Sequence, residues 1–343
     1  MYQRFVRTSP GISGYFLLVI AVVLNLAVQG LNFFSGWNFS SIFSGNAPLI
    51  IVCMAQMIAI LVGGIDLSVG STMCLANTLI VMLTNKQRWP TLGAWLAALA
   101  ACTLVGLLNG AIIAFIRIPP ILTTLSTMSI VGGLALIVQQ RPGGVVPREV
   151  YSRYGGFTLG LPTTFWVILA MILIWYLIGR YPLGRHLRAV GGNERSAYAC
   201  GIRTPLVKLS AYTLVGFYTG IAGICVTCLT ATGDPRIGIP FTLNSVAGAV
   251  LGGTVFGAGW GSIGGTVAGG FFLALVNNIV FFAFSALIRL FSDYTPSPYM
   301  QNLLSSAIIV FALASTAVTY KRQESAQKRQ KAEFQEKLHG RQG

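Results

Sequence analysis

Long apolar segments dominate this sequence and constrain its fold more than any other feature. The first, Gly14–Phe34, contains no charged side chain, and about 20 apolar residues in a helix are enough to cross the hydrocarbon core of a bilayer. Charged residues make up only 9% of the chain, against about 25% in soluble domains, so most of the surface must face lipid. Because lipid offers the backbone no hydrogen-bond partners, and because the runs do not alternate, they predict helices rather than barrel strands.

The hydropathy pattern predicts an all-α integral membrane protein with ten spans. The predicted spans are Gly14–Phe34, Ala47–Gly64, Asp66–Thr84, Leu92–Ile116, Ile121–Gln139, Thr163–Gly179, Leu206–Cys228, Leu243–Phe256, Ile263–Leu287 and Met300–Tyr320. We expect residues 1–320 to form one transmembrane domain, and the polar, basic residues 321–343 to form a cytoplasmic tail.

Lysine and arginine are distributed unequally over the predicted loops. If the N-terminus is cytoplasmic, 16 of the 23 basic residues lie on the cytoplasmic side, as the positive-inside rule requires. An even number of spans then returns the C-terminus to the same side. The net charge of +15 is therefore largely a topology signal, and the scattered basic residues argue against a nucleic-acid partner.

The sequence offers few groups for chemistry. It has no glycine-rich phosphate loop of the G-x-x-x-x-G-K-[ST] type, two histidines and eight acidic residues, of which only Asp66 lies at membrane depth. We expect no catalytic residue, no metal and no cofactor on this chain, so the energy for any pumping must come from another chain. The main alternative is an ion-coupled secondary transporter, but such carriers commonly bury several ionisable residues along their path.

A glycine-rich turn follows the second predicted span. Gly63 and Gly64 allow unusual backbone angles and close helix approach. Asp66 is placed to accept hydrogen bonds from the N–H groups two and three residues later and so to cap the next helix. The alternative interpretation is that this turn, with Ser68, lines the translocation path or faces a partner, and moves during transport.

The longest internal segment on the predicted cytoplasmic side is residues 180–205. Asn193 is a favourable N-cap, Glu194 suits the first turn of a helix, and Gly201 suits a left-handed C-terminal cap. These signals predict a short helix over Glu194–Cys200.

So short a helix needs packing against another surface to be stable. We expect Ala197, Tyr198 and Cys200 to supply the packed side and Arg195 to stay polar. The helix either docks a cytoplasmic motor or rests on the lipid surface.

Five amide side chains lie within predicted spans, where exposure to lipid is costly. They either line a path for a polar solute or make bonds between helices. They are Gln56, Asn77, Asn109, Asn277 and Asn278.

Three motifs, in order, resemble the permeases of ribose-type sugar ABC importers, a group within the wider branched-chain amino acid permease superfamily. They are GGIDLSVGS at Gly63–Ser71, LGRHLRAVGGNERSAYACGI at Leu183–Ile202 and AGAVLGGTVFGAGWGSIGGTVAG at Ala247–Gly269, followed by Asn277 and Asn278. The similarity runs from about the first span to the last. The first two motifs look more like sugar than amino acid permeases, and an ABC permease for amino acids is the alternative.

The resemblance implies a type II importer fold in the bacterial inner membrane. Two permeases, identical or paralogous, would form the pore, two cytoplasmic ATPase subunits would hold ATP and Mg, and a periplasmic solute-binding protein would deliver a monosaccharide. It also implies an ATPase-coupling site. With its immediate neighbours, this predicted site comprises Gly191, Gly192, Asn193, Glu194, Arg195, Ser196 and Ala197.

Overall fold

The computed structural model describes residues 11–291 and, beyond them, residues 303, 306, 307 and 310. The chain divides into two units at Ala283, and the account below concerns the first. Its α-helices are α2 (Ile12–Gln29), α3 (Gly36–Leu61), α4 (Val69–Asn85), α5 (Thr91–Ala111), α6 (Pro120–Val138), α7 (Arg148–Tyr154), α8 (Thr163–Arg180), α9 (Pro182–Gly192), α10 (Glu194–Ala199), α11 (Thr204–Thr230), α12 (Ile239–Leu251) and α13 (Ile263–Phe291), the last of which continues beyond Ala283.

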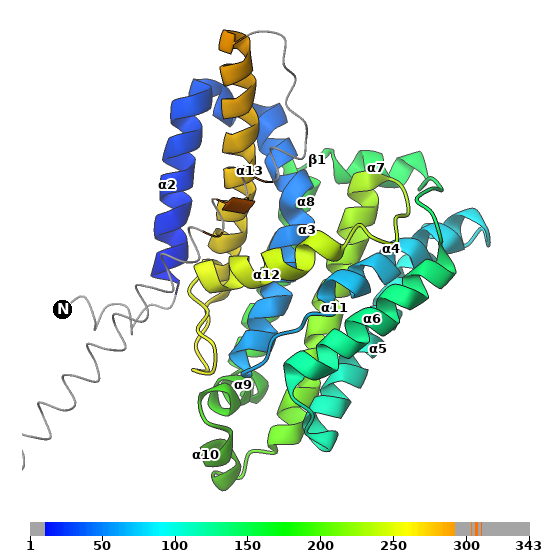
Figure 1. Ribbon diagram of the computed structural model, residues 1–343, viewed down its shortest axis with the longest axis vertical. Coiled ribbons are helices and arrows are strands. Elements are labelled where there is room, and N and C mark those ends of the chain that lie inside the picture. Colours follow the sequence, from blue (N-terminus) through cyan, green and yellow to red (C-terminus); the bar gives the residue numbers. More distant parts are fainter. Residues whose placement is uncertain (1–10, 292–302, 304–305, 308–309, 311–343) are drawn as a thin grey trace, which may run out of the picture. The chain divides into compact units, whose positions relative to one another are not determined.

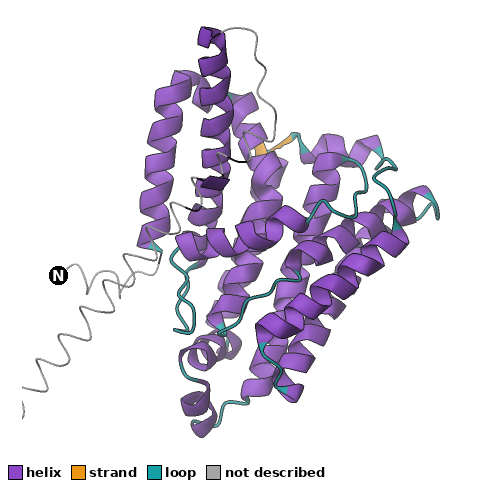
Figure 2. Cartoon of the chain, in the orientation of Figure 1, coloured by secondary structure: helices purple, strands orange, loops and turns teal. Residues whose placement is uncertain are grey.

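Helices account for nearly all the regular structure of the described residues (Figure 2). A 3₁₀ turn, Gly30–Phe34, extends α2, and a π-helical turn, Ile112–Ile116, extends α5. Two short strands, β1 (Phe157–Thr158) and β2 (Leu161–Pro162), pair antiparallel between α7 and α8. The sequence patterns predicted neither α7 nor this hairpin.

Seven helical segments of the described part are long and apolar enough to cross a membrane. They are Ile12–Phe34, Gly36–Leu61, Thr91–Ile116, Pro120–Val138, Thr163–Arg180, Thr204–Thr230 and Ile263–Ala283. Each coincides with a predicted span, although α3 begins at Gly36, eleven residues before the predicted start at Ala47. The predicted span Met300–Tyr320 falls almost entirely outside the described residues, and the count of ten remains a prediction.

Two predicted spans are shorter apolar helices in the structure. Helix α4 has 17 residues and begins at Val69 rather than Asp66, because the turn after α3 takes up the residues between. Helix α12 has 13 residues and ends at Leu251 rather than Phe256. It ends there because Gly253, with φ of 87°, turns the chain and lets Thr254 N–H bond back to Ala249 O.

Helix α3 lies at the centre of this unit, and its residues from Ala47 to Leu61 are buried. It packs against α8, α11 and α12, while α4 packs against α5, α6 and α11 (Figure 1). Helices α2, α5, α6 and α8 carry many exposed apolar side chains, among them Phe16, Leu92, Ile130 and Leu173. A monomer rarely exposes so large an apolar surface to water, so these helices face lipid.

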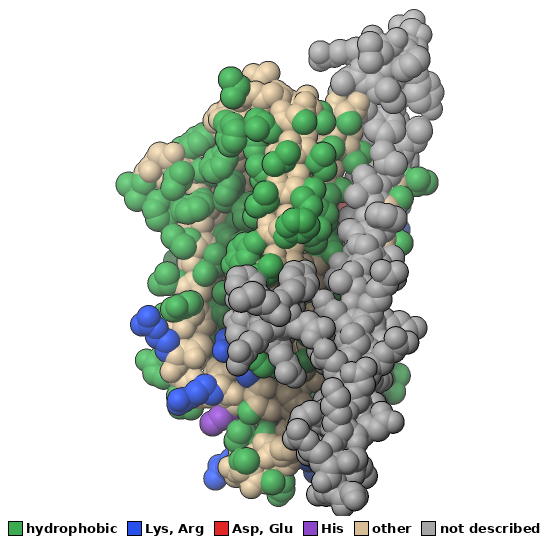
Figure 3. Space-filling view, turned by 90° about the vertical axis from the view of Figure 1, so that its left-hand side faces the viewer, with side chains coloured by type: hydrophobic (Ala, Val, Ile, Leu, Met, Phe, Trp, Pro, Cys, Tyr) green, Lys and Arg blue, Asp and Glu red, His purple; other side chains and the backbone are tan. Residues whose placement is uncertain are grey.

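The two ends of this bundle differ. Helices α9 and α10 lie at one end, and α7 with the β1–β2 hairpin lies at the other (Figure 1). In the face drawn in Figure 3, hydrophobic side chains cover the body, and basic side chains and a histidine gather at the end that carries α9 and α10. The segment that the sequence places in the cytoplasm is thus held at a basic end.

Candidate functional site

The turn between α3 and α4 is explained by its two glycines. Gly63 has φ of 86°, and the N–H groups of Gly63 and Gly64 donate to Ile60 O and Ala59 O over 2.9 and 3.0 Å, the two bonds of a Schellman cap. A Cβ on Gly64 would overlap the Tyr212 hydroxyl. Both predicted properties are confirmed: Gly63 supplies the unusual angle and Gly64 the close approach.

Asp66 is buried and organises the end of this turn. One of its carboxylate oxygens accepts from Ser68 N–H over 2.8 Å and from the Ser68 hydroxyl over 2.6 Å. The first bond is the predicted one to the residue two positions later. The N-cap of α4 is nevertheless Ser68, whose side chain makes no capping bond to the helix. Its hydroxyl instead donates to Asp66 and accepts from Asn109.

Two of the five predicted amides hold this turn in place. The Gln56 amide, in the orientation that satisfies both its groups, donates to Asp66 O over 3.0 Å and accepts from Asp66 N–H over 3.2 Å. Asn109 donates to the Ser68 hydroxyl over 3.0 Å and accepts from Thr127 over 2.6 Å. Gln56 thus bonds α3 directly to this buried turn. Asn109 bonds α5 to the turn through Ser68, and Thr127 of α6 bonds to Asn109.

Asn77 and Asn278 also bond between helices, and Asn277 does not. Asn77 donates to Thr227 on α11 and to Thr232 O, each over 3.0 Å, and accepts from Asp234 N–H over 2.6 Å. Asn278 on α13 accepts from Gln29 on α2. Within the described residues Asn277 makes no hydrogen bond, and its side chain is exposed.

The predicted coupling segment, residues 180–205, contains two helices rather than one. Helix α9 begins with Pro182 in its first turn, buries Leu187 and Val190, and exposes Arg185 and Arg188 on its other face. The sequence patterns did not predict it, although a proline start followed by apolar residues at helical spacing is a usable signal.

The short helix after α9 forms as predicted. The Asn193 side chain accepts from Ser196 N–H over 3.0 Å, which makes it the N-cap of α10. Gly201, with φ of 83°, donates to Tyr198 O, and Ile202 N–H donates to Ala197 O, so a second Schellman cap ends the helix.

Of the three residues predicted to form the packed side of α10, one packs within this chain. Ala197 is buried, but Tyr198 is 71% exposed and Cys200 is also exposed. Consecutive helical residues are turned by about 100°, so a six-residue helix that buries Ala197 directs its neighbour away from the bundle. Helix α10 is instead joined to α11 by an ion pair, Glu194 to Lys208, with an N–O distance of 2.7 Å.

The coupling segment touches the end of α3. A Cβ added to Gly191 would overlap Leu61 O, and one added to Gly259 would overlap Arg188 O. Glycine is required at both positions because three backbones meet there: the ends of α9 and α3, and the loop before α13. Leu61 is the last residue of α3, and the Gly63–Ser68 turn follows directly. The predicted coupling site and the Gly63–Ser68 turn are therefore connected by the backbone contact between Gly191 and Leu61.

Of the predicted coupling residues, Gly191 and Ala197 are buried. The others are exposed: Gly192, Asn193, Glu194, Arg195 and Ser196. They form a surface that a partner can reach at the basic end of the bundle.

Comparison with known proteins gives a consistent result. Residues 38–313 match the family model described as branched-chain amino acid transport system / permease component. The ribose import permease protein RbsC of Escherichia coli (strain K12) is 31% identical over 268 residues, which cover 76% of this chain and 82% of the relative.

Two further relatives come from the same organism. The D-allose transport system permease protein AlsC is 30% identical over 267 residues, 77% of this chain and 82% of the relative. The galactose/methyl galactoside import permease protein MglC is 26% identical over 331 residues, 91% and 95% respectively. No solved structure matches.

Proposed function

This chain belongs to the branched-chain amino acid transport system permease family, and on that premise we propose that it is the translocation subunit of an ATP-driven sugar importer. The three relatives described above are named as permeases for ribose, allose and galactose, which favours a monosaccharide over an amino acid. The described spans hold no acidic residue, and the buried Asp66, in the turn between α3 and α4, bonds to Ser68, so an ion-coupled carrier is disfavoured.

The proposal has a defined assembly. A second copy or a paralogue completes the pore, separate cytoplasmic subunits bind and hydrolyse ATP with Mg, and a periplasmic binding protein delivers the sugar. We propose the type II importer fold with about ten spans for residues 1–320. We also propose that the chain lies in the bacterial inner membrane with both termini, including residues 321–343, in the cytoplasm. The basic end that carries α9 and α10 supports this orientation.

The observation that carries the mechanism is the contact of Gly191 with Leu61 O. The exposed residues Gly192–Ser196 meet the ATPase, and α9 passes their displacement through this contact to the end of α3. The Gly63–Ser68 turn, bonded to α5 and α6 through Asn109 and Thr127, then shifts as a unit. ATP drives transport because its binding favours one of two permease states, and no covalent chemistry is needed on this chain.

The experiment is co-expression with the neighbouring transport genes, purification through this chain and reconstitution in vesicles. We expect an ATPase to copurify and its hydrolysis to rise when a sugar-loaded binding protein is added. Glu194→Arg, which reverses charge on the exposed surface of α10, should leave the chain in the membrane and abolish copurification. A chain that takes up solute without any ATPase would refute the proposal.

A further inference from the structure

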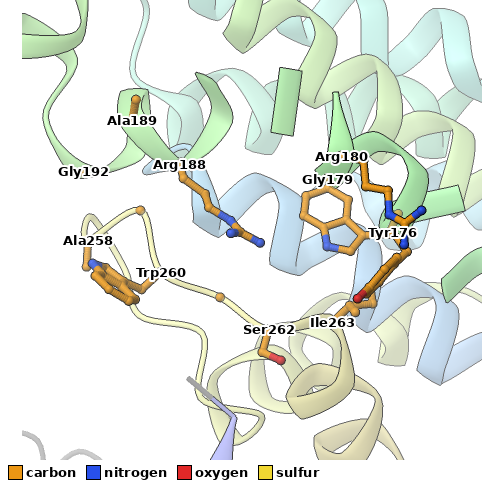
Figure 4. Close-up of a pocket in the computed structure, with 13 residues that line it drawn as sticks. Tyr176, Gly179, Arg180, Arg188, Ala189, Gly192, Ala258, Trp260, Ser262 and Ile263 are labelled. Carbon is orange, nitrogen blue, oxygen red and sulfur yellow. The ribbon is translucent and has the colours of Figure 1, made fainter. Parts of the chain in front are cut away.

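A pocket of about 870 Å³ lies at the end of α8, beside the coupling segment. Helices α8 and α9 and the loop before α13 form its walls, and most of its lining is glycine, alanine and aromatic side chains. Figure 4 shows Arg188 extending from α9 into the space between Trp260 and Ser262 and the α8 residues Tyr176 and Arg180. Of the residues in the proposed ATPase surface only Gly192 lines this pocket, and the transport mechanism gives no role to the pocket's side chains.

Two arginines give the pocket an uncompensated positive charge. Within the described residues the one ion pair joins Glu194 to Lys208, so neither Arg180 nor Arg188 is paired with a carboxylate. The Arg180 guanidinium lies 5.3 Å from the centre of the Tyr176 ring, which orients it without neutralising it. A guanidinium fork is suited to phosphate oxygens.

The same pocket lies at the end of a span, which is where we expect the membrane interface. Arg180 is the last residue of α8, an 18-residue apolar helix long enough to span the bilayer. Leu173, Tyr176 and Leu177 of that helix are each at least half exposed, and Trp260 at the rim is 52% exposed. Exposed aromatic side chains at the end of a span are typical of the headgroup region.

The N-terminus of α13 also borders the pocket. Ser262 and Ile263 line it, and Ile263 is the first residue of α13. The first N–H groups of a helix have no acceptors within the helix and carry a partial positive charge. They add to the attraction that the two arginines exert on an anion.

We propose that this pocket binds the phosphodiester headgroup of an anionic phospholipid, with the acyl chains along the exposed apolar face of α8. Basic pockets between spans on the cytoplasmic side are the usual form of such sites. The apolar wall continuous with α8 favours a lipid over a free anion, which would gain nothing from it. The site requires only that α8 spans the membrane, so the proposal stands independently of the transported solute.

The test is tryptophan quenching in the full-length chain reconstituted in phosphatidylcholine vesicles. Brominated phosphatidylglycerol should quench at a lower mole fraction than brominated phosphatidylcholine, because Trp175 and Trp260 line the pocket. Arg180→Gln and Arg188→Gln should each reduce that preference about fivefold, since a basic residue near the surface contributes about that factor. Arg185→Gln is the matched control, because Arg185 is exposed on α9 but does not line the pocket.

Quenching by brominated phosphatidylcholine must stay unchanged in each variant, which shows that the chain remains folded and inserted. Trp260→Phe should remove part of the quenching that is specific to phosphatidylglycerol. Equal quenching by both lipids, or an unchanged preference in the two arginine variants, would overturn the proposal. Displacement of brominated phosphatidylglycerol by inorganic phosphate would also overturn it, because the site would then be one for a soluble anion.

Discussion

Gly191→Ala is the most direct test of the contact between α9 and α3. The added methyl group would overlap Leu61 O, and this neighbour is backbone, which cannot turn aside as a side chain can. Overpacking of this kind costs about 1–3 kcal/mol, while alanine recovers about 0.5–1 kcal/mol of helix stability. We therefore expect a net loss of up to about 2.5 kcal/mol and a displacement of α9 away from Leu61.

Gly192→Ala is the matched stability control. Its methyl group would lie 3.6 Å from Ala258 O, an ordinary contact, and neither glycine has positive φ. Thermal unfolding of the purified chain should show a lower midpoint for Gly191→Ala and an unchanged or slightly higher one for Gly192→Ala.

The functional assay is uptake per ATP hydrolysed in reconstituted vesicles. We expect Gly191→Ala to retain ATP hydrolysis but to lose most of the uptake that accompanies it, because the displacement of α9 no longer reaches α3. Gly133→Ala, where a methyl group would meet no atom within 4 Å, serves as the uptake control. Normal uptake per ATP in Gly191→Ala, together with the expected loss of stability, would refute transmission through this contact.

The remaining predictions concern the buried tyrosines, the ion pair and the exposed cysteine. Tyr212→Phe should keep or raise the free energy of unfolding, because the buried Tyr212 hydroxyl has no partner among the described residues. Tyr218→Phe should lower it by about 1 kcal/mol, because it removes the 2.8 Å bond to Met171 O. Equal thermal unfolding midpoints for the two variants would contradict this. Glu194→Gln should lower the free energy of unfolding by less than about 1 kcal/mol, since the ion pair with Lys208 is partly exposed. A large loss of transport without a matching loss of stability would assign Glu194 to the ATPase contact. A membrane-impermeant maleimide should label Cys200, the exposed cysteine of the six, in inside-out vesicles and not in whole cells, with Cys200→Ser as the blank; labelling from outside would reverse the proposed topology.

Local signals in the sequence predicted local structure well. Asn193 forms the N-cap of α10, and Gly63 and Gly201 end helices with positive φ. Each of these depends on residues fewer than six positions apart, so the sequence contains all the information that the cap needs. The membrane spans followed in the same way, because length and hydropathy are properties of one segment.

Contacts between distant segments were not predictable from the same patterns. The requirement for glycine at position 191 comes from Leu61, which lies 130 residues earlier, and no spacing rule connects them. The side chains of Tyr198 and Cys200 were expected to pack because they are apolar or small, but packing depends on which face of α10 meets the bundle. Only Ala197 is on that face.

The hydrogen bonds of the five predicted amide side chains indicate where a polar solute crosses the membrane. Gln56, Asn77, Asn109 and Asn278 each bond to another helix or to the buried turn, so each has a partner within the chain, and their part in the translocation path stays a prediction. A hydrated sugar needs polar groups that are free to exchange bonds with it. Asn277 is exposed in the middle of an apolar helix, where burial against lipid alone would be costly. We therefore expect its face of α13 to border the path, completed by a second permease copy rather than by this chain alone.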